Sequence, residues 1–177
     1  MPKSSNEQIE KDEKKILKEL KINANKSIND IAKNCGFSRQ KVWRVVKNLE
    51  KNKTIWGYTA ILDYDKLNKK RYQMLLKRSH QPVTKQLLNN ILNREIKEKV
   101  KEMGVEYLDS IYTNGYYDWI LTFIANDLKS AKKVVELYKK LYGGLFSEIK
   151  LNEEMFVVQK CGVDNPEIEK LKDFFTI

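Results

Sequence analysis

The stretch around Gly36 constrains the fold of this chain more than any other feature. Glycine adopts a left-handed backbone at little cost, which suits a tight turn between two helices. Ala32 precedes it by four residues, and a small side chain there lets the two helices approach closely. Ser38 follows as an N-cap, which stabilises a helix start by about 1 kcal/mol. The stretch 28–47 therefore predicts two short helices joined by a tight turn.

The second of these helices has one apolar and one basic face. The apolar positions recur at helical spacing, and they are Val42, Val45, Val46 and Leu49. The opposite face carries Arg39, Gln40, Trp43, Arg44 and Lys47. This is the layout of a helix-turn-helix DNA reader. The alternative is an ordinary helical hairpin with a solvated basic face, but the agreement of every inward position favours DNA binding.

The charge distribution supports the same interpretation. The chain of 177 residues has a formal net charge of +10. Residues 1–53 hold 14 Lys or Arg against 7 Asp or Glu, whereas residues 54–177 hold 20 against 17. A Lys-rich overall composition could explain the total, but it does not explain this asymmetry. Basic clusters favour polyanionic partners, so the first third is the expected DNA-binding part.

Other residue types predict little chemistry. The two cysteines, Cys35 and Cys161, are far apart, and His80 is the only histidine. This spacing predicts no disulfide framework, no metal site, no cofactor and no catalytic group. No apolar run approaches the roughly 18 residues needed to span a membrane, and the N-terminus lacks a signal-peptide core. We therefore expect a soluble cytoplasmic protein without membrane partners.

The segments on either side of the helix-turn-helix also predict secondary structure. An amphipathic helix is predicted from Asp12 to Lys21, and Ser27 is the expected N-cap of the helix 28–33. The recognition helix should end near Asn52, which tolerates a left-handed C-cap. Residues 54–63 are β-branched and aromatic, which predicts a strand that serves as a wing, a hinge or both. Residues 64–70 read as a linker.

The second half alternates between strand and helix patterns. Strands are predicted at 71–78, where Tyr72, Met74 and Leu76 alternate on one face, at 105–112, on the return from a turn at Asn114-Gly115, and within 145–158. Helices are predicted at 84–103, with the apolar stripe Leu88, Leu92, Ile96 and Val100, and at 128–142. A short terminal helix is expected at 166–175. The order βαββαβ predicts a ferredoxin-like fold, with two helices on one face of an antiparallel sheet. We expect the other face to be rich in apolar side chains and covered by a second copy of the sheet.

The fold class is therefore α+β, with an N-terminal (winged) helix-turn-helix domain and a C-terminal ferredoxin-like βαββαβ domain. The predicted boundaries are 9–53 for the DNA-binding domain and 54–68 for the hinge strand and linker. A sensing and oligomerisation domain follows at 69–162, and then a tail at 163–177.

This arrangement resembles the Lrp/AsnC (feast/famine) transcription regulators, of the archaeal type. Four segments carry the resemblance: 12–17 (Asp-x-x-x-Ile-Leu), 38–42 (Ser-x-x-x-Val), 49–58 (Leu-Glu, then Ile-x-Gly-Tyr) and 115–118 (Gly-Tyr-Tyr-Asp). Two departures stand out. Lys53 replaces the usual glycine after the recognition helix, and Tyr116 replaces a residue that is often charged.

The resemblance and the exposed face together predict the site residues. The expected DNA contacts are Ser38, Arg39, Gln40, Lys41, Trp43, Arg44 and Lys47, on double-stranded DNA. Trp43 could instead pack against the first helix or Trp56, and we slightly favour that role. The resemblance implies a homodimer, or an octamer built from dimers. It also implies an amino-acid effector near Gly115, Tyr116, Tyr117 and Asp118. From the residues alone, a purely structural role is favoured for Gly115, and for Asp118 a structural role and ligand contact are equally well supported.

The expected function is sequence-specific DNA binding for transcription regulation, without enzyme activity. Two alternatives remain open at this point. The same architecture resembles sirohaem decarboxylases, but His80 is the only candidate for acid–base chemistry. A low-specificity architectural DNA-binding protein would instead show a steep salt dependence and little sequence discrimination.

Overall fold

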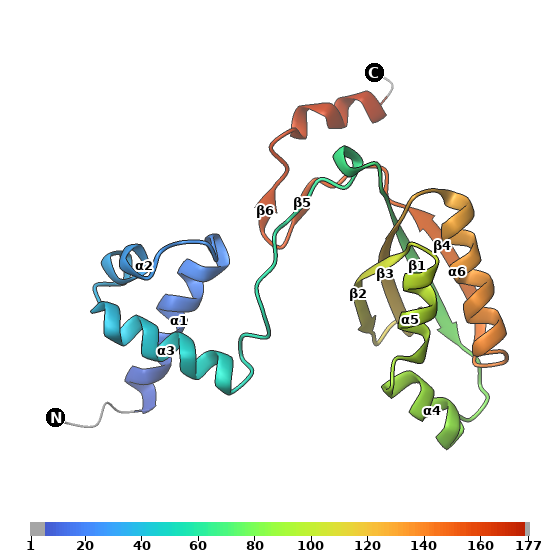
Figure 1. Ribbon diagram of the computed structural model, residues 1–177, viewed down its shortest axis with the longest axis horizontal. Coiled ribbons are helices and arrows are strands. Elements are labelled where there is room, and N and C mark those ends of the chain that lie inside the picture. The colour runs from blue at the N-terminus through green and yellow to red at the C-terminus, as the bar shows by residue number, and fades with distance from the viewer. Residues whose placement is uncertain (1–5, 176–177) are drawn as a thin grey trace. The chain divides into compact units, whose positions relative to one another are not determined.

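The computed structural model describes residues 6–175 and divides into two compact units (Figure 1). The first unit contains the chain up to Ile61 together with the segment from Val158 on, and the second unit contains Leu62–Val157. The segment from Val158 to Asp164 thus straddles the predicted boundary between sensing domain and tail. Each unit has its own hydrophobic core.

Three helices form the body of the first unit: α1 (Asn6–Ile22), α2 (Ile28–Cys35) and α3 (Arg39–Lys51). The predicted start of α1 at Asp12 was wrong, because the helix begins six residues earlier. Ion pairs of 2.6 Å, Lys11–Glu7 and Lys14–Glu10, support the added turns. Such i,i+4 pairs on a helix surface stabilise the helix by roughly 0.2–0.5 kcal/mol each.

The turn between α2 and α3 confirms the prediction from Gly36. Its backbone is left-handed, with φ of 69°, and its N–H points back to the carbonyls of Ala32 and Lys33. No atom lies within 4 Å of where a Cβ would stand. The glycine is therefore required by its backbone conformation and not by lack of space. Helix α2 extends two residues beyond the predicted end at Lys33.

The predicted strand at 54–63 was wrong, because this segment contains no strand. A strand needs a neighbouring backbone to accept and donate its hydrogen bonds, and this segment has no such neighbour among the described residues. Trp56 is 94% exposed, so the apolar side chains that suggested a strand are not buried. The predicted left-handed cap at Asn52 was also misplaced, since Lys53 adopts that conformation with φ of 62°.

The end of the chain contains a small hairpin that the sequence did not predict. It pairs β5 (Gln159–Lys160) with β6 (Val163–Asp164). Cys161 and Gly162 form its turn, with φ of 50° and 81°. The predicted terminal helix is present as a 3-10 helix, η2 (Ile168–Phe174).

The second unit is a four-stranded antiparallel sheet with helices on one face (Figure 1). Its elements in chain order are η1 (Asp65–Leu67), β1 (Lys70–Arg78), α4 (Lys85–Leu92), α5 (Glu95–Glu102), β2 (Glu106–Tyr112), β3 (Trp119–Ala125), α6 (Leu128–Leu141) and β4 (Phe146–Glu153). The strand order β2-β3-β1-β4 places the two central strands, β1 and β3, side by side. The ferredoxin-like prediction is confirmed.

The core of this unit follows the predicted alternation. Tyr72, Met74 and Leu76 of β1 are almost fully buried, and they pair across the sheet with Phe123, Leu121 and Trp119 of β3. Helix α6 closes this layer with Ala131, Val134, Val135 and Tyr138. Asp127 caps the helix by accepting a hydrogen bond from the backbone N–H of Ser130.

The predicted long helix at 84–103 was wrong, because it is broken into α4 and α5. Arg94 takes a left-handed conformation with φ of 53° at the break. The break rotates the apolar stripe, so that Leu88 and Leu92 are 47% and 68% exposed. In their place Leu87 and Ile91 pack on the core.

The turn after β2 also differs from the prediction. Asn114 and Gly115 do not adopt the positive φ values of a two-residue type I′ hairpin. Instead, a six-residue loop joins β2 to β3. It is closed by a hydrogen bond of 2.8 Å from the Thr113 N–H to the Asp118 carbonyl.

The face of the sheet opposite the helices carries both apolar and polar side chains. The register places Leu75 and Ile120 next to each other, with Ile111 opposite Ile120 on the neighbouring strand. Ile124, 5% exposed, lies on the same face opposite Arg71. The other residues of the face are polar or charged: Arg71, Gln73, Lys77, Glu106, Asp109, Thr122, Glu148, Lys150 and Asn152. Four apolar side chains thus lie among polar and charged ones, and the covering of this face by a second copy stays a prediction.

Candidate nucleic-acid interface

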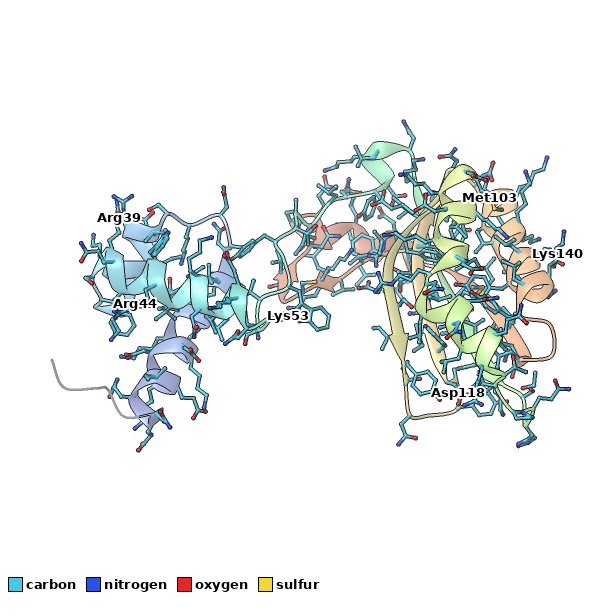
Figure 2. All side chains as sticks on the ribbon, turned by 60° about the horizontal axis from the view of Figure 1, so that its bottom comes forward. Arg39, Arg44, Lys53, Met103, Asp118 and Lys140 are labelled. Atoms are coloured by element: carbon cyan, nitrogen blue, oxygen red, sulfur yellow. The ribbon has the colours of Figure 1, made fainter. Side chains whose placement is uncertain are left out.

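Helix α3 presents one exposed polar and basic face. Arg39, Gln40, Trp43, Arg44 and Lys47 are all exposed, while Val42 and Leu49 are buried on the other side. Arg39 and Arg44 both stand on α3 (Figure 2). The structure brings these predicted residues together on one helix, with donors suited to phosphates and base edges.

The start of this helix is firmly held. The Ser38 hydroxyl accepts a hydrogen bond of 3.2 Å from the Lys41 N–H, which confirms its predicted role as an N-cap. On the inner face, Val42 packs with Ile16 of α1 and Ile31 of α2. Because the three helices share one core, the exposed face of α3 has a fixed orientation within this three-helix body.

Lys41 is placed differently from the other predicted DNA contacts. Its ammonium lies 2.5 Å from a carboxylate oxygen of Asp12, whose side chain is 6% exposed. It also lies 4.0 Å from the centre of the Phe37 ring. The hydrogen bond from Lys41 is the main cause that lowers the pKa of Asp12, against the opposing effect of burial. Lys41 thus anchors α3 to α1.

Sequence reasoning missed Asp12 as part of this arrangement. The available signal was its position four residues before Ile16, on the buried stripe of α1. A carboxylate on such a stripe requires a partner. Gln8 also donates to it, at 2.9 Å.

The C-terminal half of the exposed face contains further polar contacts. Lys47 pairs with Glu50 at 2.8 Å, but the lysine side chain is 55% exposed. Tyr58 donates to the other oxygen of Glu50 at 3.1 Å. The hydrogen bond from Lys47 is the main cause that lowers the pKa of Glu50.

Trp43 is 54% exposed, and no ring contact involves it among the described residues. The alternative that Trp43 packs against Trp56 is wrong, because Trp56 is almost fully exposed. Trp43 therefore remains available on the candidate interface.

The predicted effector residues lie in the loop between β2 and β3, and most of their groups already have partners. Asp118 accepts a hydrogen bond of 2.7 Å from the backbone N–H of Arg78, which is the structural role considered for it. The Lys77 ammonium lies 3.7 Å from the ring centre of Tyr116, and Lys150 lies 5.9 Å from that of Tyr117. Gly115 makes no close contact that a Cβ would disturb.

Other kinds of site find little support between residues 6 and 175. His80 is exposed after β1, and no group of three metal-ligating side chains occurs in the described part of the chain. None of the helices seen there is long and apolar enough to cross a membrane.

A comparison with known protein families supports a DNA-binding fold for the first unit. Residues 13–55 match the family model for winged helix-turn-helix DNA-binding domains. The match covers the part of α1 from residue 13 on, together with α2 and α3, although no wing strand follows them among the described residues. A comparison with curated protein sequences finds no match.

Solved structures of similar fold span nearly the whole chain. An AsnC family transcriptional regulator from Agrobacterium tumefaciens is 20% identical, with a TM-score of 0.58, over 84% of this chain and 92% of that one. A transcriptional regulator from Neisseria meningitidis, solved with L-methionine, is 16% identical, with a TM-score of 0.61, over 85% and 92%.

A third similar structure is a feast or famine regulatory protein from Mycobacterium tuberculosis, complexed with L-methionine. It is 12% identical, with a TM-score of 0.66, over 86% of this chain and 95% of that chain. At these identities the likeness establishes the shared fold. This chain thus has an N-terminal winged helix-turn-helix domain and a C-terminal α+β unit of the kind found in these regulators.

Proposed function

We propose that this chain is a cytoplasmic transcription regulator of the Lrp/AsnC kind, which binds double-stranded DNA in a sequence-specific manner. The observation that carries the proposal is the exposed polar and basic face of α3, held by a shared three-helix core. The match of residues 13–55 to winged helix-turn-helix domains supports it. The similar fold of known regulators supports the whole arrangement.

In this mechanism α3 enters the major groove. Arg39, Gln40 and Arg44 are our candidates for base edges, because their side chains match the donor and acceptor patterns of guanine and adenine. Lys47 and the Ser38 end of the helix suit phosphates, which set register and affinity but carry no sequence information. Trp43 suits a thymine methyl or a sugar edge. Lys41 contributes by positioning the helix, since its ammonium is paired with Asp12.

The regulator acts as a dimer in this proposal. Two recognition helices would then contact half-sites about 34 Å apart, one turn of DNA. The exposed sheet face supports self-association through the apolar residues Leu75, Ile120 and Ile111, flanked by charges of both signs. Light scattering tests this: a monomer at micromolar concentration contradicts it, and a mass of eight subunits indicates that dimers assemble further.

A comparison of two variants tests the division between base and phosphate contacts. Arg44→Ala should weaken binding to a selected operator by about 1–3 kcal/mol, with a smaller effect on scrambled DNA. Lys47→Ala should weaken binding to both probes alike and reduce the slope of affinity against salt by about one. Lys140→Ala, in the second unit, is the matched control and should leave both affinities unchanged.

Fluorescence anisotropy with operator and scrambled duplexes measures these effects. Equal losses on both probes for Arg44→Ala would remove the assignment of a base contact. A wild-type protein that binds every duplex alike, with a steep salt dependence, would identify an architectural DNA-binding protein instead.

We further propose that an amino acid modulates DNA binding through the loop 115–118. Two regulators of similar fold were solved with L-methionine, which supports this class of effector. Titration of wild type and Tyr116→Ala with L-methionine, with and without operator DNA, tests the idea. If Tyr116→Ala binds L-methionine as the wild type does, the loop is not the site.

A further inference from the structure

The second unit contains a cavity of about 590 Å³ that none of these roles uses. It lies between the broken helix pair α4 and α5 and the strands β2 and β3, with α6 below it. This volume is in the range of pockets that hold small molecules. The loop residues 115–118 do not line it, so it is separate from the effector loop discussed above.

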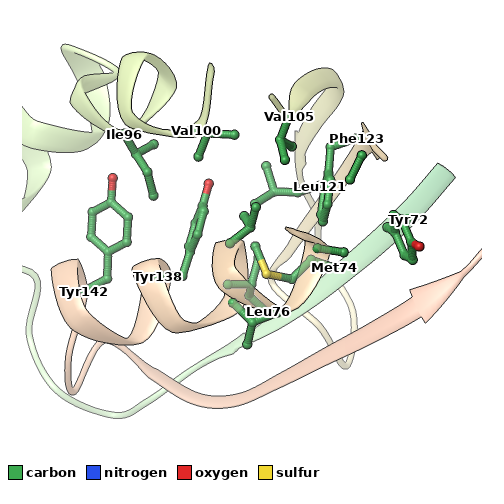
Figure 3. Close-up of a cluster of buried hydrophobic side chains, with 14 of the residues drawn as sticks. Tyr72, Met74, Leu76, Ile96, Val100, Val105, Leu121, Phe123, Tyr138 and Tyr142 are labelled. Atoms are coloured by element: carbon green, nitrogen blue, oxygen red, sulfur yellow. The ribbon is translucent and has the colours of Figure 1, made fainter. Parts of the chain in front are cut away.

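Aromatic rings form much of its wall. Tyr138 and Tyr142 rise from α6 with their hydroxyls directed toward Ile96 of α5 (Figure 3). Their ring centres are 5.3 Å apart, and Phe146 meets Tyr142 edge-on at 6.3 Å. On the sheet side, Trp119 completes the wall. Such a surface suits a flat or branched apolar body.

Hydrogen-bond donors lie among these rings. The hydroxyls of Tyr107 and Tyr138 lie 3.0 Å apart and share one hydrogen bond, so one of their two protons is left for another acceptor. Burial raises the pKa of Tyr107 to about 12 and also raises the pKa of Tyr138, so both hydroxyls stay protonated near neutral pH. Trp119 donates its Nε1 proton to the Ser110 hydroxyl at 2.9 Å, which leaves the Ser110 proton free to donate. The cavity therefore favours a ligand that accepts hydrogen bonds.

Two cations stand at its rim. Arg94 occupies the left-handed break between α4 and α5, and Lys97 donates its backbone N–H to the Arg94 carbonyl at 2.9 Å. Neither side chain forms an ion pair within the described residues. The cavity is also lined by one carboxylate, Asp109, so the cations exceed the anions. Leu92 at the rim is 68% exposed, an apolar group that a ligand would cover.

We propose that this cavity binds a small monocarboxylate with an aromatic or branched apolar body. The body lies against Tyr138, Tyr142, Phe146 and Trp119. The carboxylate lies toward Arg94 and Lys97. The inference concerns the second unit alone, so it stands or falls independently of DNA binding.

The test uses the full-length chain with Trp43→Phe and Trp56→Phe, which leaves Trp119 as the only one of its 3 tryptophans. Titration with 3-phenylpropionate should change the emission of Trp119 in a saturable manner. 3-Phenylpropanamide has the same shape without the charge, and it should bind roughly tenfold more weakly or worse, since hydrogen bonds to charged groups are the stronger ones. Isothermal titration repeats both measurements without the fluorescent reporter.

Paired variants locate the site. Arg94→Asn with Lys97→Gln should weaken 3-phenylpropionate binding by roughly tenfold or more. Asparagine is chosen because it tolerates the left-handed backbone at this position. The control, Lys99→Gln with Lys101→Gln, removes the same amount of charge from α5 but touches no cavity wall, and it should leave the affinity unchanged.

Several results would overturn the proposal. They are an absence of saturable binding, equal binding of the acid and the amide, and equal losses in the two paired variants. Loss of binding in Tyr116→Ala with full binding in the Arg94 and Lys97 variant would move the site to the loop.

Discussion

The ion pair between Asp12 and Lys41 offers the sharpest test of how α3 is held. The Asp12 side chain is 6% exposed and the Lys41 side chain 33%, with 2.5 Å between the charged atoms. The perturbation is Lys41→Met, which keeps an apolar stem of similar length over the Phe37 ring. It leaves a buried carboxylate without its cation, and only the Gln8 hydrogen bond remains.

The expected loss in the free energy of unfolding for Lys41→Met lies between two reference values. Removing one partner of a fully buried pair costs about 3–5 kcal/mol, whereas an exposed pair contributes about 0–1 kcal/mol. Because Asp12 is buried and Lys41 is partly exposed, we expect about 2–3 kcal/mol at pH near 7. For a unit of this size, this corresponds to a midpoint of thermal unfolding lower by roughly 10 °C.

The effect should depend on pH with a definite sign. The folded-state pKa of Asp12 is lowered, chiefly by the Lys41 hydrogen bond, so its contribution to stability is present above the unfolded value of about 3.9. This contribution is lost as pH falls through the folded pKa. Since the carboxyl is then neutral in both proteins, the difference between wild type and Lys41→Met should narrow below about pH 4.

Urea unfolding followed by tryptophan emission measures this. A Trp119→Phe background leaves only Trp43 and Trp56, both in the first unit. Lys14→Met is the matched control, because the Lys14–Glu10 pair is 70% and 64% exposed. That variant should cost less than about 0.5 kcal/mol. Adding Asp12→Asn to Lys41→Met should restore part of the stability, since no buried charge is then left.

Two outcomes would refute the reasoning. One is a loss for Lys41→Met that is no larger than that of Lys14→Met. The other is a loss that does not change with pH. If DNA affinity fell strongly while stability did not, Lys41 would contact phosphate, as the sequence suggested.

Two further predictions concern single residues, Lys53 in the first unit and Asp118 in the second. Lys53→Gly should stabilise the first unit by about 1 kcal/mol in the same urea assay, because φ is 62° there. Lys51→Gly, inside α3, should instead destabilise the unit by about 1 kcal/mol. A first unit that is less stable with Lys53→Gly than with Lys51→Gly would contradict this account. Asp118→Ala should destabilise the second unit by about 1.5–3 kcal/mol, because it removes a charged acceptor from the Arg78 N–H. Thermal unfolding measures this, with Asp118→Asn losing less, and an unchanged midpoint for Asp118→Ala would leave ligand contact as the role of the residue.

Local features were predictable wherever their causes lie within a few residues of the chain. Ser38 caps α3 as expected, and Gly36 takes its left-handed turn. The alternation of Tyr72, Met74 and Leu76 placed the core face of β1 correctly. These features depend on backbone preference and side-chain period, which the neighbouring residues determine. The order of such elements was enough to predict the ferredoxin-like topology.

Features that depend on distant partners were not predictable in the same way. The segment 54–63 has the composition of a strand, but no neighbouring backbone pairs with it among the described residues. The pattern at 84–103 fits one helix, yet Arg94 breaks it so that Ile91 and Ile96 can both pack on the core. Periodicity cannot show such a change of direction, because Leu87 and Ile91 fit a helical spacing as well as Leu88 and Leu92 do.

The candidate DNA interface shows both sides of this division. The sequence by itself determined which side chains lie on the exposed face of α3, since helical period and capping decide that face. Only the tertiary structure separated Lys41 from the others, by bringing it to the buried carboxylate of Asp12. It likewise brought Tyr138 and Arg94 to the same cavity. Burial and pairing between residues far apart in sequence exist only once the chain has folded, because contacts in space create them.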